Sequence, residues 1–233
     1  MRKLIITASL VFSLLGTNAL ANPQIDCVDF YNDGDYQRAL EPCTIMAEQG
    51  FAIFQYILGQ MYYGGLGVAQ NHTVSARWFS LAAEQGDKIS QLYLGMMYRF
   101  GIGVVQNYGE AVRWYRAAAE QGNAASQNSL GFLYNQGLGV AQNYTEAVRW
   151  YRVAAEQGRA DAQINLGVAY RNGQGVIQSY VQAHMWYNIA AANGAGDEAI
   201  SRRNSIATQM TQQQIAEAQA RAQRCLDSYY ADC

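Results

Sequence analysis

The chain has 233 residues, half of them hydrophobic and 17 of them tyrosines, so it has ample material for a packed core and is not a disordered chain. Sixteen basic residues stand against 18 acidic ones, with no cluster of Lys and Arg. The electrostatic attraction that nucleic acids and anionic lipid surfaces require is therefore missing, and we exclude both classes of partner.

Residues 1–21 resemble a bacterial export signal. Basic residues at positions 2 and 3 precede an apolar stretch over residues 4–15, and residues 19–21 read Ala-Leu-Ala, the small-x-small spacing of a signal-peptidase site. We predict cleavage after Ala21 and a periplasmic or secreted mature protein. The apolar stretch is too short to cross a bilayer, so an uncleaved anchor is the weaker alternative and no membrane insertion is expected after cleavage.

A period of 36 residues runs through the middle of the chain. The tryptophans of the protein all follow it: Trp78, Trp114, Trp150 and Trp186. The motif Leu-Gly-x-x-Tyr recurs from residues 58, 94, 130 and 166, and the motif Gly-x-Gly-Val recurs from residues 65, 101, 137 and 173. Glu-Gln-Gly closes units at residues 50, 86, 122 and 158. Self-similarity at a fixed period of this length indicates an array of structural repeats.

Each unit predicts two helices. In the second 36-residue repeat the first helix covers residues 88–100, and its buried stripe has the i, i+3, i+4, i+7 spacing. The stripe consists of Gln91, Leu94, Gly95 and Tyr98. Gly95 allows a neighbouring helix to approach closely, and the paired glycines of the next loop end the helix because glycine accepts a positive φ without steric cost.

The second helix of the same unit begins after Asn107, a good N-cap, and Glu110 is placed to complete a capping box. The helix ends before Gly122. Its expected buried residues are Ala111, Trp114, Tyr115 and Ala118.

These motifs closely resemble the Sel-one-like repeat family, a branch of the tetratricopeptide superfamily. The resemblance implies an all-α fold class, an α-solenoid in which antiparallel helix pairs stack into a right-handed superhelix. It divides the chain into a signal peptide (1–21), a degenerate N-terminal capping repeat (22–50), four 36-residue repeats (51–194) and C-terminal capping helices (195–233). One departure is Ser75, which stands where later repeats have alanine.

The two ends deviate from the repeat pattern. In the degenerate N-terminal repeat Asp35 takes the N-cap position. Pro42 falls in the middle of the expected second helix of this repeat, so we predict a kink or a late helix start there. At the other end we predict a helix over residues 197–210, followed by Thr211 as the N-cap of a helix from residue 212 to about 226. Terminal repeats need such polar caps.

Four cysteines in a chain with an export signal favour disulfides over metal sites. In the repeat register Cys27 and Cys43 face each other across one helix pair. Cys225 and Cys233 would lie about 12 Å apart in a continuous helix, beyond bonding range. If they bond, the helix must break near residues 227–230. Other pairings would join opposite ends of the array, so we favour Cys27 with Cys43 and Cys225 with Cys233.

Residues for metal or covalent chemistry are few. We expect His72 and His184 to be partly exposed structural residues, with no zinc site and no cofactor. A small cysteine-rich group within the Sel-one-like repeat family is linked to penicillin binding and β-lactam hydrolysis. The resemblance therefore implies an alternative function, an enzyme that acts on cell-wall or β-lactam substrates. Lys88 is the only lysine after residue 21, and no serine stands three residues before it, so the Ser-x-x-Lys arrangement is absent.

The expected non-catalytic function is binding of a protein or peptide segment in the concave groove formed by the first helices. The candidate contact residues are Tyr56, Ile57, Gln60, Tyr93, Met96, Phe100, Asn128, Phe132, Asn165 and Asn172. The aromatic and apolar members would anchor the partner, the asparagines would bond its backbone, and the protein itself is expected to be a monomer. The alternative for these residues is simple packing between neighbouring helices.

A third hypothesis is a structural element of an envelope complex that uses the convex, second-helix face. The recurring arginines of that face are Arg113, Arg116, Arg149 and Arg152.

Overall fold

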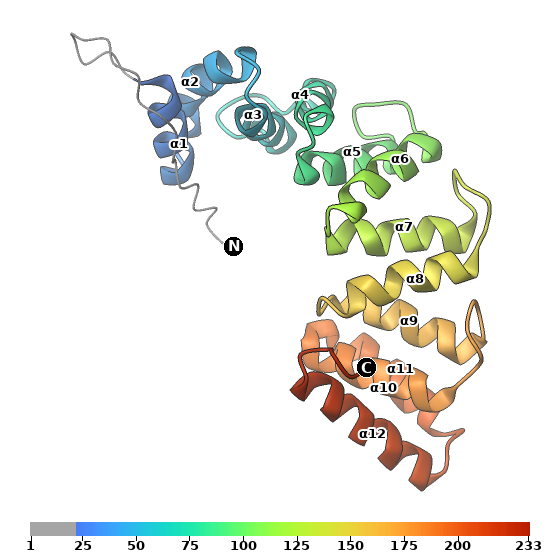
Figure 1. Ribbon diagram of the computed structural model, residues 1–233. Helices are drawn as coiled ribbons and strands as arrows, with labels where there is room; N and C mark the ends of the chain where they lie inside the picture. The colour runs from blue at the N-terminus through green and yellow to red at the C-terminus, as the bar shows by residue number, and fades with distance from the viewer. Residues whose placement is uncertain (1–21) are drawn as a thin grey trace. The chain divides into compact units, whose positions relative to one another are not determined.

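The computed structural model describes residues 22–233, so the predicted signal segment lies outside the described residues. Within residues 22–233 the chain forms twelve α-helices and one short π-helical turn, with no β-strand. Consecutive helices pack as pairs, and the predicted all-α solenoid fold is confirmed (Figure 1). The chain divides into two compact units, the first ending at Gln106 and the second beginning at Asn107.

The first unit holds the degenerate leading pair, the first complete repeat and the first helix of the next one. Its helices are α1 (Pro23–Asp33), α2 (Tyr36–Glu48), α3 (Ala52–Gly64), α4 (His72–Glu84) and α5 (Lys88–Phe100). The bounds of α5 are those predicted from the buried stripe. In α2 the helix begins at Tyr36 and continues through Pro42, so the expected late start is wrong. The side chain of Asp35 accepts a hydrogen bond from the Arg38 N–H and starts the helix well before the proline.

The second unit holds the remaining repeats and the terminal helices. In chain order it begins with α6 (Tyr108–Glu120), α7 (Ala124–Gln136), α8 (Tyr144–Ala155) and α9 (Ala160–Asn172). They are followed by α10 (Tyr180–Ala190), the π-helical turn η1 (Ala191–Ala195), α11 (Gly196–Ala207) and α12 (Gln212–Asp227). The helix α11 ends before the predicted Met210, whereas α12 begins after its predicted N-cap, Thr211.

The second helices begin at side-chain caps, as predicted, but the capping box expected at Glu110 is wrong, and none forms at the equivalent Glu146. Asn107 and Asn143 each accept a hydrogen bond from the N–H three residues on. The two glutamate carboxylates instead pair with arginines one turn further along: Glu110 with Arg113 at 3.3 Å and Glu146 with Arg149 at 2.9 Å. A charged partner on the same face competes successfully with the backbone N–H of the cap. A reciprocal box does form between Thr211 and Gln214.

Glycine in the Leu-Gly motif sets the spacing within each helix pair. A Cβ added at Gly59 would lie 2.5 Å from the ring of Phe79, and one added at Gly167 would lie 2.5 Å from the ring of Tyr187. Phe79, Tyr151 and Tyr187, each of which follows a tryptophan, therefore pack directly on the backbone of the facing helix. This confirms the close approach expected at this motif position.

The second glycine of each Gly-x-Gly loop packs against the preceding repeat. Gly139 has a φ of 70°, and a Cβ added there would lie 2.3 Å from the carbonyl group of Tyr108, the first residue of α6. Gly175 has the same relation to Tyr144 at the start of α8. The loop therefore serves as a contact between successive repeats as well as a helix end.

Buried glutamines join each helix pair to the next. One glutamine near the start of each first helix donates its side-chain N–H to an alanine carbonyl near the end of the preceding second helix. These bonds run from Gln55 to Ala47, Gln91 to Ala83, Gln127 to Ala119 and Gln163 to Ala155, at 2.9–3.1 Å. We call this set the glutamine relay.

A second amide extends the relay within a repeat. Gln157 donates to the Oε1 of Gln127 at 2.7 Å, and Asn193 donates to the Oε1 of Gln163 at 3.0 Å. Gln85 likewise donates to the Oε1 of Gln55 at 2.8 Å, so Gln55, Gln127 and Gln163 each use both donor and acceptor. A polar side chain bonded in this way can be accommodated in a core without a large desolvation cost.

Disulfides join both pairs of cysteines in the predicted pattern. Cys27 and Cys43 connect α1 to α2 with a Cα–Cα distance of 4.8 Å, and Cys225 and Cys233 lie 4.7 Å apart. The helix α12 ends at Asp227, between Cys225 and Cys233. Tyr229 and Tyr230 there adopt positive φ angles of 50° and 70°, so the chain turns back as the bridge requires.

Substituting methionine for Gln163 should lower the free energy of unfolding by about 2 kcal/mol, because the buried Ala155 carbonyl and the Asn193 amide each lose a partner. Urea unfolding followed by circular dichroism measures the effect. The matched control is Gln178→Met, an exposed glutamine that donates to the Arg171 carbonyl at 2.8 Å. Equal losses in the two variants would show that the relay does not stabilise the array.

Two glycine substitutions separate loop strain from loop packing. Gly122 and Gly139 both have positive φ, at 82° and 70°, but a Cβ at Gly122 would have nothing within 4 Å. Gly139→Ala should therefore destabilise the protein by about 1–3 kcal/mol more than Gly122→Ala, because it adds overpacking to the shared backbone strain. The comparison uses the same unfolding assay, and similar losses would contradict the inter-repeat contact.

Candidate functional site

The first unit carries a hydrogen-bonded cluster on its first helices. Gln60 in α3 lies at its centre. Its Oε1 accepts a hydrogen bond from the hydroxyl of Tyr31 in α1 at 2.8 Å, and its Nε2 donates to the hydroxyls of Tyr56 and of Tyr93 in α5. We call these four residues the tyrosine–glutamine cluster. One side chain thereby links the first helices of three successive pairs.

Aromatic contacts fix the orientation of Tyr93. Its ring stacks on that of Phe79 in α4, with centroids 4.7 Å apart and an interplanar angle of 10°. The ring of Tyr63 meets Tyr93 edge-on at 5.7 Å and lies 5.1 Å from the ring of His72. Tyr93 is therefore held by its hydroxyl and by the contacts of its ring with Phe79 and Tyr63, which preorganises it for contact with a partner.

Burial raises the pKa of two tyrosines of the cluster. Burial raises the pKa of Tyr31 to about 12, with smaller contributions from Tyr36 and Tyr93. Burial also raises the pKa of Tyr56, again with a contribution from Tyr93. At neutral pH these groups donate and accept hydrogen bonds but do not act as bases.

Exposure divides the predicted contact residues of the first unit. Ile57 is fully buried and Tyr56 is only 8% exposed, so the expectation that their side chains contact a partner is wrong. The neighbouring helices enclose α3, so that residues 54–59 are all buried, and the ring of Tyr56 approaches that of Phe79. Gln60 is partly buried within the cluster.

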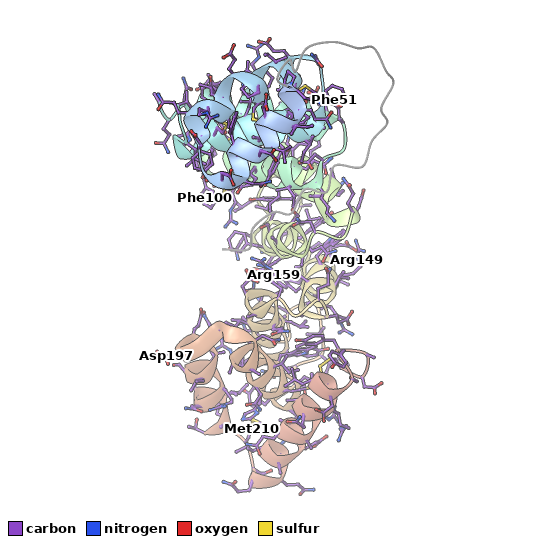
Figure 2. All side chains as sticks on the ribbon, turned by 90° about the vertical axis from the view of Figure 1, so that its left-hand side faces the viewer. Phe51, Phe100, Arg149, Arg159, Asp197 and Met210 are labelled. Atoms are coloured by element: carbon purple, nitrogen blue, oxygen red, sulfur yellow. A yellow bond between two sulfur atoms is a disulfide. The ribbon has the colours of Figure 1, made fainter. Side chains whose placement is uncertain are left out.

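The accessible candidates of the first unit lie along α5. Tyr93 and Met96 are partly buried, and Phe100 at the end of the helix is 57% exposed (labelled in Figure 2). The guanidinium of Arg99 lies 4.8 Å from the centre of the Phe100 ring. We define Tyr93, Met96 and Phe100 as the α5 surface.

In the second unit the predicted residues gather around a small cavity. Asn165 in α9 donates to Asn128 in α7 at 2.9 Å, joining two successive first helices. Phe132 and Asn165 line a cavity of about 220 Å³. Its other lining residues are Asn135, Gln136, Tyr151, Val168, Ala169, Gln174 and Arg202. The predicted Asn172 is exposed and lies beside this cavity rather than in its wall, with its side chain bound to Gln174 at 3.2 Å.

Sequence reasoning missed Tyr31 and Arg202, which belong to the terminal helices α1 and α11. These helices lack the repeat motifs, so the repeat register could not align either residue with the first helices. The one available signal for Tyr31 was its place in the degenerate leading unit.

Arginines on the second helices of the second unit are engaged within the chain. Besides their glutamate partners, Arg113 and Arg149 lie over the rings of the tryptophans that follow them, at 4.1 and 4.2 Å from the ring centres (Arg149 is labelled in Figure 2). Arg116 and Arg152 donate to tyrosine hydroxyls of the next first helix. These contacts account for the recurrence of the arginines without a partner on that face.

The two histidines differ in their surroundings. His72 is partly buried, as expected, but His184 is only 2% exposed, so its expected partial exposure is wrong. Its Nδ1 lies 3.1 Å from the side-chain amide of Asn188, and burial, with a contribution from Arg203, lowers its pKa. Across residues 22–233 no group of three or more His, Cys, Asp or Glu side chains is placed to hold a metal ion.

None of the helices in the described part of the chain combines the length and the apolar character that a membrane crossing requires.

The tyrosine–glutamine cluster predicts a loss of stability in alkali. The pKa of Tyr31 in the folded protein lies above its ordinary value of 10, so the folded state holds the proton more tightly than the unfolded state. Its contribution to stability is complete below pH 10 and is lost as the pH rises through about 12. Urea unfolding at pH 9 and pH 11.5 should show a smaller loss for Tyr31→Phe than for the wild type. The exposed Tyr229→Phe is the control, and identical losses in all three proteins would contradict the prediction.

Comparisons with known proteins agree on the architecture. The model of the Sel1 repeat matches residues 52–87, 88–123, 124–158 and 160–194. The crystal structure of a Sel1 repeat protein from Oxalobacter formigenes is 35% identical, with a TM-score of 0.71, and the match covers 76% of this chain and 71% of that one.

A second crystal structure is that of c5321, a protective antigen present in uropathogenic Escherichia coli strains that displays an SLR fold. It is 26% identical, with a TM-score of 0.51 and coverage of 89% of this chain and 68% of that one. The comparison with curated proteins found no match. Four consecutive matches to one repeat model, on the helix pairs and glycine loops described above, show that the chain belongs to the Sel1 repeat family.

Proposed function

We propose that this protein is an exported, non-catalytic scaffold that binds a protein or peptide segment on the surfaces of its first helices. Sel1 repeats generally mediate protein–protein interaction, and proteins built from them are typically non-catalytic scaffolds. The observation that carries the proposal for this chain is the α5 surface. There the exposed Phe100 lies on the same helix as Tyr93, which is fixed by stacking and hydrogen bonding.

The physical argument rests on exposure combined with rigidity. A large aromatic side chain in water gains free energy when a partner covers it, and aromatic residues dominate the binding energy of many interfaces. The cluster around Gln60 holds the neighbouring Tyr93 in place before any partner arrives. Little side-chain entropy is then lost on binding, so more of the contact energy appears as affinity.

Export is supported by the paired cysteines. Both bridges join residues near the ends of the described chain, and disulfides persist in oxidising compartments such as the periplasm or the extracellular space. The hydrolase alternative lacks a comparable observation, because the sequence contains neither the Ser-x-x-Lys motif nor a Gly-x-Ser-x-Gly elbow.

Selection of a random twelve-residue peptide phage library on residues 22–233 tests the α5 surface. We expect enriched clones with a common apolar or aromatic motif, and a loss of at least about tenfold in their affinity for Phe100→Ala, the usual scale of an aromatic hot spot. Fluorescence anisotropy with the synthetic peptide of an enriched clone measures this affinity. Circular dichroism should be unchanged, since Phe100 lies largely outside the core.

The matched control is Val105→Ala. Val105 is a hydrophobic residue of the same unit that is 88% exposed, but it lies in the loop after α5 and outside the α5 surface. Its truncation should leave the affinity unchanged. Equal binding by wild type and Phe100→Ala, or no enriched peptide at all, would contradict the proposal.

A further inference from the structure

The cavity of the second unit has a partly polar lining whose one charged side chain is positive. It lies among α7, α9 and α11, with Tyr151 of α8 in its wall and Phe132 and Val168 supplying apolar surface. Arg202 is the only charged residue that lines it, and no carboxylate is among its lining residues. An anionic group is therefore the charge complement of this cavity.

The hydrogen bonds already formed in the wall leave two amide N–H groups free, those of Gln174 and Asn135, beside two amide oxygens, those of Asn165 and Gln136. Gln174 accepts a hydrogen bond from Asn172 through its Oε1, and Asn135 accepts one from Gln136 through its Oδ1, so the amide N–H groups of both Gln174 and Asn135 are unused. Asn165 donates to Asn128, which leaves its Oδ1 as an acceptor. The wall thus offers two neutral donors besides the arginine.

Arg202 is positioned by a neighbour on its own helix. Glu198, one turn earlier in α11, accepts hydrogen bonds from its Nε at 3.1 Å and from its Nη2 at 2.9 Å through a single oxygen. This pair orients the guanidinium and leaves Nη1 without a partner. An arginine held in this way still has donors for a second carboxylate.

We propose that this cavity is a subsite for the carboxylate of an aspartate or glutamate side chain within the bound peptide segment. Arg202, Gln174 and Asn135 donate to the carboxylate, and Asn165 accepts a main-chain N–H beside it. The inference rests on the proposed function for the identity of the ligand. A side chain fits this arrangement better than a chain terminus, because it has main chain on both sides to meet the amides of α7 and α9.

Titration of ¹⁵N-labelled residues 22–233 with small probes tests the subsite directly. The probe is N-acetylglutamate N-methylamide, and its neutral isostere N-acetylglutamine N-methylamide is the reference. We expect the acid to shift the side-chain resonances of Gln174, Asn165 and Arg202 and to bind about tenfold more tightly than the amide, since hydrogen bonds to an ionised group are the stronger ones. N-acetylalanine supplies a terminal carboxylate and should bind more weakly than the glutamate probe.

Variants test whether Arg202 causes the preference for the acid probe over the amide probe. Arg202→Gln should remove the tenfold preference for the acid, and Arg202→Lys should keep part of it. The control is Arg221→Gln, because Arg221 forms the same i,i+4 pair with Glu217 at similar exposure but lies on α12 outside the cavity. The wild-type comparison of the two probes is decisive even if Arg202→Gln does not fold.

Failure of the subsite is distinguishable from failure of the scaffold. Equal binding of acid and amide, shifts elsewhere than the cavity, or tighter binding of N-acetylalanine would overturn the subsite, whatever the peptide selection on the α5 surface shows. Retention of the preference by Arg202→Gln would do the same. Loss of peptide binding together with an intact glutamate preference would instead overturn the proposed function.

Discussion

The buried glutamine relay is the interaction on which the stacking of helix pairs depends. A helix leaves carbonyl groups at its end without partners, and in each repeat one of these lies where the next helix begins. The relay meets that need with a side chain whose own oxygen is bound in turn, as with Gln163 between Ala155 and Asn193. Hydrophobic packing alone is tolerant of sliding, whereas a bond between two fixed amides sets one register for successive pairs.

Fixed register is also what makes the first helices usable as binding surfaces. Gln60 can connect tyrosines from three helices only because those helices are held at constant spacing, and the Asn128–Asn165 bond has the same requirement in the second unit. In both units the repeat motifs build the frame, and the residues that vary between repeats supply the chemistry. The first unit offers aromatic surface and the second offers amides with one arginine.

The sequence predicted the frame well because its determinants are local and repeated. Glycine loops, asparagine caps and the stripe of residues 91–98 placed the helices, and the repeat register paired the cysteines. The predictions that proved wrong concern competition between neighbours. Glu110 pairs with Arg113 instead of its cap, and Ile57 is buried because the neighbouring helices enclose α3, whose residues 54–59 are all buried. The cavity was beyond reach, because Arg202 comes from a helix outside the repeat register.

The tail after α12 folds back onto the last repeat. The bridge between Cys225 and Cys233 closes the turn that carries Tyr230, whose hydroxyl accepts a hydrogen bond from Asn193 at 2.7 Å. The covalent bridge thereby secures the outermost hydrogen bond of the line that runs from Ala155 through Gln163 and Asn193 to the phenol.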